Sequence, residues 1–130
     1  MNKHPIQQEV ERFIEELYAL KSRKIVMQAR TNGESLESIA EKLNVTRERV
    51  RQIEAKYTRR FALWCGKTNI IKKIISDSNS SLSNNLLKEY FGNYYPEMIY
   101  LLCLYKNRYY SGSQLDYLDF SEIQIDNIGI

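Results

Sequence analysis

Apolar residues recur at three- and four-residue intervals along most of the first 75 residues, a spacing typical of amphipathic helices. The pattern predicts one helix over residues 6–20, with Pro5 placed where a first helical turn tolerates proline. A second helix is predicted over residues 21–30. The sequence Thr-Asn-Gly at 31–33 ends it, because glycine readily takes the left-handed conformation that terminates helices.

Two further helices are predicted on either side of a tight turn. Ser35 is suited to cap a short helix over residues 36–43, and Thr46 is suited to cap the helix that follows. Asn44 lies between them, and asparagine tolerates the left-handed conformation better than most residues. The pattern therefore predicts two helices joined by a sharp corner.

The second of these helices is predicted to be long, running from Arg47 to about Trp64. Gly66 is expected to end it, since glycine is a poor helix former and a common terminator. Residues 70–75 fit either another short helix or the start of a linker.

The composition changes after residues 76–81, a small and polar stretch that we interpret as a linker or exposed loop. Eight of the ten tyrosines lie between residues 90 and 117. Helices are predicted over residues 82–91 and 94–105, and the alternation over residues 108–120 predicts a β-hairpin. We expect the tyrosines to pack in a core or a protein interface rather than on nucleic acid.

These elements predict a mainly α-helical fold with two parts. A helix-turn-helix unit spans residues 1–75, and a tyrosine-rich, acidic α+β module with the hairpin spans residues 76–130. The sequence ends at residues 128–130 without an obvious terminus, so the chain could be a fragment of a longer protein. The oligomeric state stays open.

Charge is distributed unevenly along the chain. Residues 20–73 contain fourteen basic and five acidic residues, a net charge of +9, whereas residues 1–19 carry −2 and residues 74–130 carry −4. A basic block of this size favours a polyanionic partner, although a solvated charged surface is an alternative interpretation.

Other functional classes find little support in the sequence. No apolar run is long enough to span a membrane, and the first residues lack the apolar core of a secretory signal. Cys65 and Cys103 are most simply a reduced intracellular pair. Because no nucleophile–base pair, phosphate loop or metal-binding spacing is present, we expect a protein that is not an enzyme and binds no metal or cofactor. The expected localisation is cytoplasmic and nucleoid-associated.

The residues of the two-helix corner fit the helix-turn-helix template. Ile39, Ala40 and Leu43 would form the inner face of the first helix, and the small side chain of Ala40 allows the second helix to cross closely. Val50 and Ile53 would form the inner face of the second helix. The sequence therefore predicts a compact corner with a shared apolar core.

A polar face lies opposite this core on the second helix. At about 100° per residue, four side chains share it: Arg47, Glu48, Arg51 and Gln52. Arginine and glutamine can bond guanine and adenine bidentately, and glutamate can accept from cytosine. The alternative is a solvated helix face whose charges pair with one another.

Residues 45–56, VTRERVRQIEAK, resemble the recognition helix of region 4 of sigma-70-type transcription initiation factors, and residues 35–40, SLESIA, resemble the segment before it. A looser likeness extends upstream, so that the resemblance covers about residues 21–60. It implies that this helix enters the major groove of a −35 promoter element. It also implies docking on the flap of the RNA polymerase β subunit.

The resemblance implies roles for particular residues. Arg47, Glu48, Arg51 and Gln52 would read bases in double-stranded DNA. The residues expected to contact phosphates, by the resemblance or by their place beside this face, are Arg30, Thr46, Arg49, Lys56, Arg59 and Arg60.

Two departures from the family change what we expect of the whole chain. The loop at residues 31–34 is shorter than the family loop, and nothing in the chain resembles region 2, which melts promoter DNA. We therefore expect a regulator, of mobile-element or phage type, rather than a working sigma factor. The alternatives are a module that docks on RNA polymerase or an anti-sigma-type partner, and the targeting domain of a longer protein.

Overall fold

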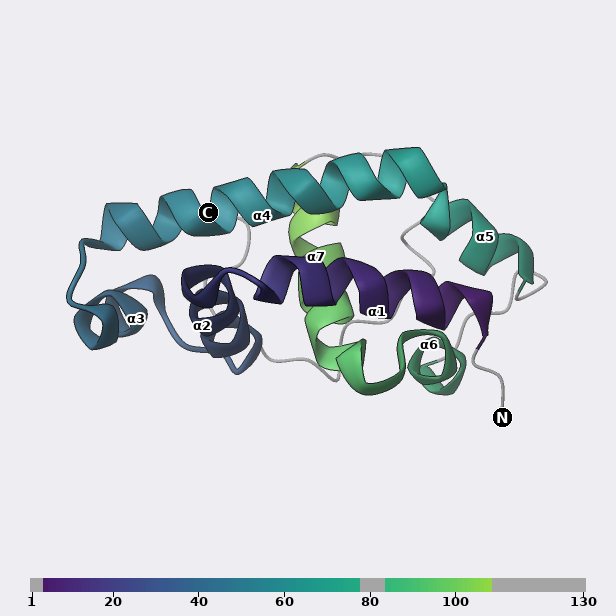
Figure 1. Ribbon diagram of the computed structural model, residues 1–130, viewed down its shortest axis with the longest axis horizontal. Coiled ribbons are helices and arrows are strands. Elements are labelled where there is room, and N and C mark those ends of the chain that lie inside the picture. The colour runs from purple at the N-terminus through teal and green to yellow at the C-terminus, as the bar shows by residue number, and fades with distance from the viewer. Residues whose placement is uncertain (1–3, 78–83, 109–130) are drawn as a thin grey trace.

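The computed structural model describes residues 4–77 and 84–108, and these residues are helical nearly throughout (Figure 1). The first five helices are α1 (Pro5–Tyr18), α2 (Lys21–Thr31), α3 (Leu36–Leu43), α4 (Arg47–Thr68) and α5 (Ile70–Asp77). They are followed by α6 (Asn84–Phe91), the short 3-10 helix η1 (Gly92–Tyr94) and α7 (Tyr95–Arg108). None of the described helices is long and apolar enough to cross a membrane.

The expected α+β character of the tail finds no support in the described residues, which contain no strand. The predicted hairpin falls almost entirely on residues 109–120, outside the described part of the chain. Its first residue, Arg108, ends α7 instead of beginning a strand. The helices expected over residues 82–91 and 94–105 correspond to α6 and α7.

Local capping explains where the helices of the corner begin. The Ser35 hydroxyl accepts a hydrogen bond from the Ser38 amide at 3.1 Å, and the Thr46 hydroxyl accepts one from the Arg49 amide at 3.0 Å. Asn44 takes the left-handed conformation, with φ of 55°. The predicted caps and turn are therefore confirmed.

The prediction that Gly66 ends α4 is wrong, because the helix continues to Thr68 and stops at Asn69. Asn69 is left-handed, with φ of 53°, and its amide donates to the Cys65 carbonyl at 2.9 Å. Packing outweighs the low helix propensity of glycine here. Phe61, Cys65 and Ile70 are all buried, and their burial holds this end of the helix in place.

The long helix α4 runs beside α1, while α7 crosses the pair and α2 and α3 lie at one end (Figure 1). Five consecutive residues of α7 are buried, 98–102, which shows that this helix is enclosed on most sides. It packs on α2 and α4, and α6 packs on α1. The described parts of the two predicted domains thus share one core, while the boundary at residue 76 stays a prediction.

Two groups of residues from the sequence patterns can now be placed. Tyr90, Tyr95 and Tyr100 are buried, so their rings contribute to packing. Cys65 and Cys103 are free thiols, and burial raises the pKa of Cys65 to about 12.

Gly66 offers a test of this account of α4. A Cβ atom added at Gly66 would meet no atom within 4 Å, and the residue lies inside a regular helix. Gly66→Ala should therefore raise the free energy of unfolding by about 0.5–1 kcal/mol, measured by urea denaturation.

The matched control is Gly92→Ala. Gly92 has φ of +57°, and a Cβ there would lie 2.4 Å from Gln7 Nε2, so this variant should be less stable than the parent. A loss of stability in Gly66→Ala would contradict the helical ending at Asn69.

Candidate DNA-binding surface

The corner between α3 and α4 has the geometry of a helix-turn-helix. The Val45 amide donates to the Ala40 carbonyl at 3.0 Å, closing the turn around Asn44. Ala40 is buried at the crossing, and Val50 and Ile53 of α4 are buried beneath it. The polar side of the first turns of α4 is consequently turned outward.

The four predicted base-reading residues are exposed on that outward side: Arg47, Glu48, Arg51 and Gln52. Arg51 donates to both carboxylate oxygens of Glu48, at 2.8 and 2.5 Å. The hydrogen bonds from the Arg51 guanidinium are the main cause that lowers the pKa of Glu48. Because the pair is exposed on both sides, it is weakly held, and both side chains can exchange it for contacts with a ligand.

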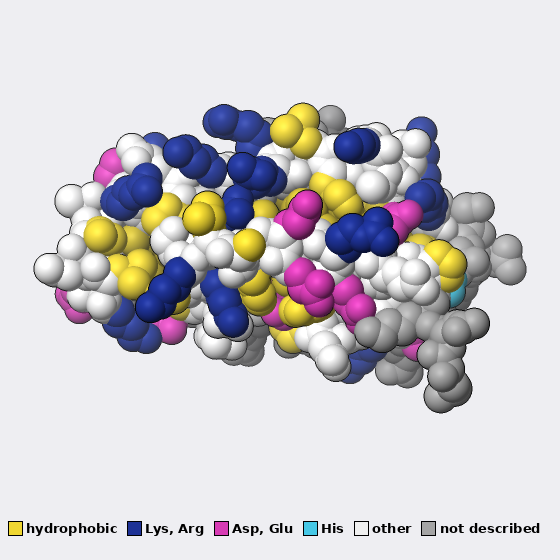
Figure 2. All heavy atoms as spheres, viewed as in Figure 1, with side chains coloured by type: hydrophobic (Ala, Val, Ile, Leu, Met, Phe, Trp, Pro, Cys, Tyr) yellow, Lys and Arg dark blue, Asp and Glu magenta, His cyan; other side chains and the backbone are white. Residues whose placement is uncertain are grey.

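Five of the six residues expected at phosphates are also exposed: Thr46, Arg49, Lys56, Arg59 and Arg60. In Figure 2, Lys and Arg side chains run along α4 and over α2, whereas Asp and Glu side chains gather over α1. The basic block of the sequence therefore forms a basic surface around the start of α4.

Arg23 joins this surface, although the sequence patterns did not single it out. A pocket of about 200 Å³ lies between the start of α2 and α4, and four cations line it: Arg23, Arg49, Lys56 and Arg60. None of the described lining residues is acidic. Burial and the nearby charge of Arg60 lower the pKa of Arg23, whose Nε has no hydrogen-bond partner among the described residues. The basic start of α2, at residues 21–24, was the signal that could have found it.

Arg30, the sixth expected phosphate contact, requires a correction. Its side chain is fully buried, and its Nε donates to Glu54 Oε2 at 2.6 Å. A second guanidinium nitrogen donates to the Glu34 carbonyl at 3.0 Å. Arg30 is therefore a structural residue that joins α2, the short loop before α3 and α4, because its guanidinium is buried against the Glu54 carboxylate inside the protein.

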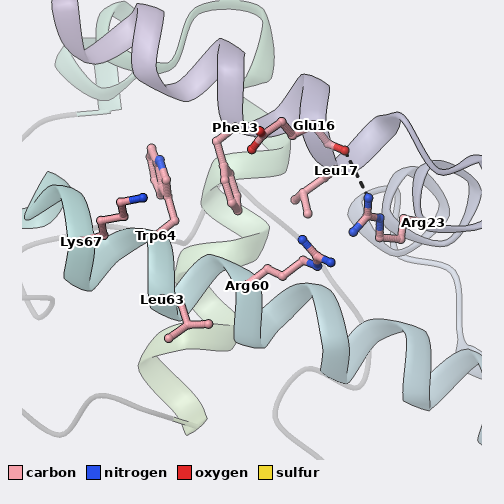
Figure 3. Close-up of a pocket in the computed structure, with 8 residues that line it drawn as sticks. All are labelled: Phe13, Glu16, Leu17, Arg23, Arg60, Leu63, Trp64 and Lys67. Carbon is pink, nitrogen blue, oxygen red and sulfur yellow. Dashed lines mark hydrogen bonds between the residues drawn. The ribbon is translucent and has the colours of Figure 1, made fainter.

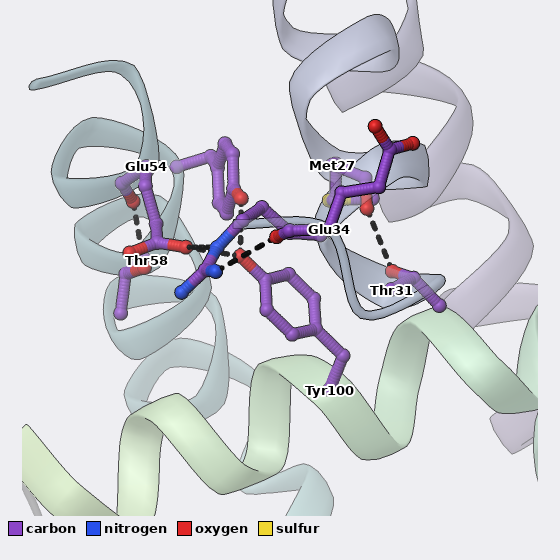
Figure 4. A network of polar contacts seen from close by, with 8 residues as sticks. Met27, Thr31, Glu34, Glu54, Thr58 and Tyr100 are labelled. Carbon is purple, nitrogen blue, oxygen red and sulfur yellow. Dashed lines mark hydrogen bonds and ion pairs between the residues drawn. The ribbon is translucent and has the colours of Figure 1, made fainter. Parts of the chain in front are cut away.

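Two tyrosines complete this buried group (Figure 4). The Tyr100 hydroxyl donates to Glu54 Oε2 at 2.7 Å, and the Tyr57 and Tyr100 hydroxyls are hydrogen-bonded to each other. Burial, which disfavours the charged phenolate, raises the pKa of both tyrosines well above the usual range. For Arg30, burial would lower the pKa, but the hydrogen bond and charge of Glu54 outweigh it and raise the value.

Comparison with known proteins identifies the part of the chain that carries this surface. Residues 21–60 match the family model of sigma-70, region 4. These residues form a sigma-70 region 4 helix-turn-helix domain. No curated protein and no solved structure matches the chain.

The sigma-70 region 4 domain accounts for forty of the 130 residues and comprises α2, α3 and the first part of α4. Region 4 is a DNA-binding domain involved in recognition of the −35 promoter element, and its family is regulatory rather than enzymatic. Four helices lie outside the match: α1, α5, α6 and α7. The family model therefore does not describe how they pack on region 4.

The structural role of Arg30 can be separated from a phosphate contact by substitution. Arg30→Met keeps much of the side-chain volume but leaves the Glu54 carboxylate buried without its cation. The free energy of unfolding should fall by about 3–5 kcal/mol, measured by urea denaturation. Unchanged stability, together with a weaker dependence of DNA affinity on salt, would instead support the phosphate contact.

Proposed function

We propose that this protein is a DNA-binding transcription regulator whose sigma-70 region 4 domain reads a −35-like duplex element through the major groove. The observation that carries the proposal is the first two turns of α4. There the side chains suited to base edges are exposed together, while Val50 and Ile53 anchor the opposite side in the core.

The division of labour between base and backbone follows from position. Arg47, Glu48, Arg51 and Gln52 read bases in this proposal, and the Glu48–Arg51 pair opens as the bases take its place. The backbone contacts come from Thr46, Arg49, Lys56, Arg59 and Arg60. Arg23 adds a further cation beside Lys56 and Arg60, so the phosphate contacts extend from α4 to the start of α2.

The first test is fluorescence anisotropy of the full chain with two labelled duplexes across a salt series. One duplex carries a −35-like element and the other a scrambled version of it. A preference that persists as salt rises would support base reading, because salt weakens phosphate contacts on both duplexes alike. Equal affinities for the two duplexes at every salt concentration would overturn it.

Two variants separate the two kinds of contact. Arg51→Ala should cost about 1–3 kcal/mol at one base position and relax the preference there. Lys56→Ala should weaken binding to both duplexes alike and reduce the salt slope by about one. Loss of affinity by the same factor on every duplex in both variants would contradict this division.

A second candidate function, docking on a protein partner, is favoured by a groove between α1 and the distal half of α4 (Figure 3). The groove has a volume of about 410 Å³, and its apolar lining consists of Phe13, Leu17, Leu63 and Trp64. The Trp64 ring stacks on Phe13 with a centroid distance of 4.6 Å, while Leu63 is 69% exposed. Aromatic residues are enriched at the centres of protein interfaces, so a groove formed by this aromatic stack and the exposed leucine favours a protein-binding surface.

In this second proposal, RNA polymerase, through its β-subunit flap, or an anti-sigma-type protein occupies the groove. Interaction with polymerase is a property of the region 4 family, which supports the first of these partners. The groove lies on the distal half of α4, away from its base-reading turns, but two of the proposed phosphate contacts, Arg23 and Arg60, line both the groove and the basic pocket.

Leu63→Glu should weaken binding of the chain to core RNA polymerase at least tenfold, measured by biolayer interferometry, since the charge would have to be buried at the interface. Its preference for the −35-like over the scrambled duplex should change little, because Leu63 is remote from the base-reading turns and any effect of the new charge on Arg60 weakens binding to both duplexes alike. Lys72→Gln is the matched control, because it makes the same change in net charge at an exposed position of α5. Equal effects of both variants would argue against the groove as the docking site.

A further inference from the structure

A helix outside the region 4 match contacts the recognition helix through a buried carboxylate. Glu54 lies two residues after Gln52 on the buried side of α4, where its side chain is 3% exposed. Its Oε2 accepts hydrogen bonds from Arg30 of α2 and from Tyr100 of α7. Three helices therefore meet at one oxygen atom, two residues beyond the last base-reading side chain of α4 (Figure 4).

The direction of the hydrogen bonds in this group can be assigned. A phenol carries a single hydrogen, and that of Tyr100 is donated to Glu54. In the contact between the two tyrosines, Tyr57 is therefore the donor and Tyr100 the acceptor. The result is a chain of hydrogen bonds from Tyr57 to Tyr100 to Glu54, all within a buried site where each bond is strengthened by the low dielectric.

This arrangement fixes α4 about its own axis. Tyr57 and Glu54 are three residues apart on α4, so the Tyr100 hydroxyl contacts two points of the helix nearly one turn apart. A rotation of roughly 10° would move side chains at a radius of about 5–6 Å by roughly 1 Å. Bidentate hydrogen bonds to base edges tolerate little displacement of this size, because their strength depends on direction.

We propose that Tyr100 is a positioning residue for DNA recognition, which holds the base-reading side chains of α4 in register through Glu54 and Tyr57. This inference rests on the proposed function of the region 4 domain. It assigns to α7, a helix that the family model does not cover, a direct part in sequence preference. The salt slope depends less on this register, because it reports how many phosphates are neutralised and not the alignment of hydrogen bonds at base edges.

Tyr100→Phe tests the proposal because it removes the hydroxyl and keeps the ring that packs α7 on α4. Urea denaturation of each variant first establishes conditions in which it is folded. The affinities of the full chain for the −35-like and scrambled duplexes are then measured across a salt series. We expect Tyr100→Phe to reduce the ratio of the two affinities about three- to tenfold and to leave the salt slope unchanged.

The matched control is Tyr105→Phe, which removes a hydroxyl from the same helix. The Tyr105 ring contacts Phe61, farther along α4 than the hydroxyl chain, so the affinity ratio should stay at the parental value. A ratio equally low in both variants, or unchanged in Tyr100→Phe, would overturn the inference. If Tyr100→Phe does not fold, Tyr57→Phe is measured in the same way, and an unchanged ratio there would also overturn it.

The two proposals fail in different ways in this experiment. A parental chain that binds both duplexes equally, or neither, would reject base reading and the positioning role with it. A parental chain that prefers the −35-like duplex, with the same preference retained in Tyr100→Phe, would reject the positioning role alone.

Discussion

The buried ion pair between Arg30 and Glu54 is the interaction on which the rest of the structure depends. It joins α2 to α4, and through the Glu34 carbonyl Arg30 also holds the short loop that leads into α3. Charges taken out of water are costly unless they are paired and hydrogen-bonded. The pair therefore restricts the three helices of region 4 to arrangements in which these contacts form together, and the apolar core of the corner packs around them.

A helix outside region 4 also contacts the buried ion pair. Tyr100 of α7 supplies a second donor to the Glu54 carboxylate, and five successive residues of α7 are buried between the other helices. This central helix packs on α2 and α4, and α1 lies beside the distal half of α4, where Phe13 stacks on Trp64 (Figure 1). Acidic side chains gather over α1 while basic ones line α4 and α2, so the surface potential favours approach of DNA to the region 4 side (Figure 2).

The parts of the fold that depend on local chemistry could be predicted from the sequence. Ser35, Asn44 and Thr46 set the corner through contacts within three residues, and the spacing of Ala40 and Val50 identified the shared core. These signals, together with the family resemblance, were sufficient to predict that Arg47, Glu48, Arg51 and Gln52 lie on the exposed side of α4.

The errors arose where distant contacts decide the outcome. Gly66 does not end α4, because residues on both sides of it are anchored in the core. Arg30 was expected at DNA, but its role follows from Glu54 and Tyr100, which lie 24 and 70 positions away and whose proximity no periodicity indicates. Arg23 was overlooked for a similar reason, since its pocket exists only when α2 and α4 are packed together.

The Arg30–Glu54 ion pair also restricts the distance between the expected DNA contacts on α2 and those on α4. Arg23 lies at the start of α2, whereas Lys56 and the base-reading residues lie on α4. Backbone contacts can set the register of a protein on DNA only if they keep a fixed distance from the side chains that read bases. Arg30 and Glu54 join these two helices through a buried ion pair. A buried ion pair, often no more stable than an apolar substitute, is thus well suited to fix geometry, and geometry is what sequence recognition requires.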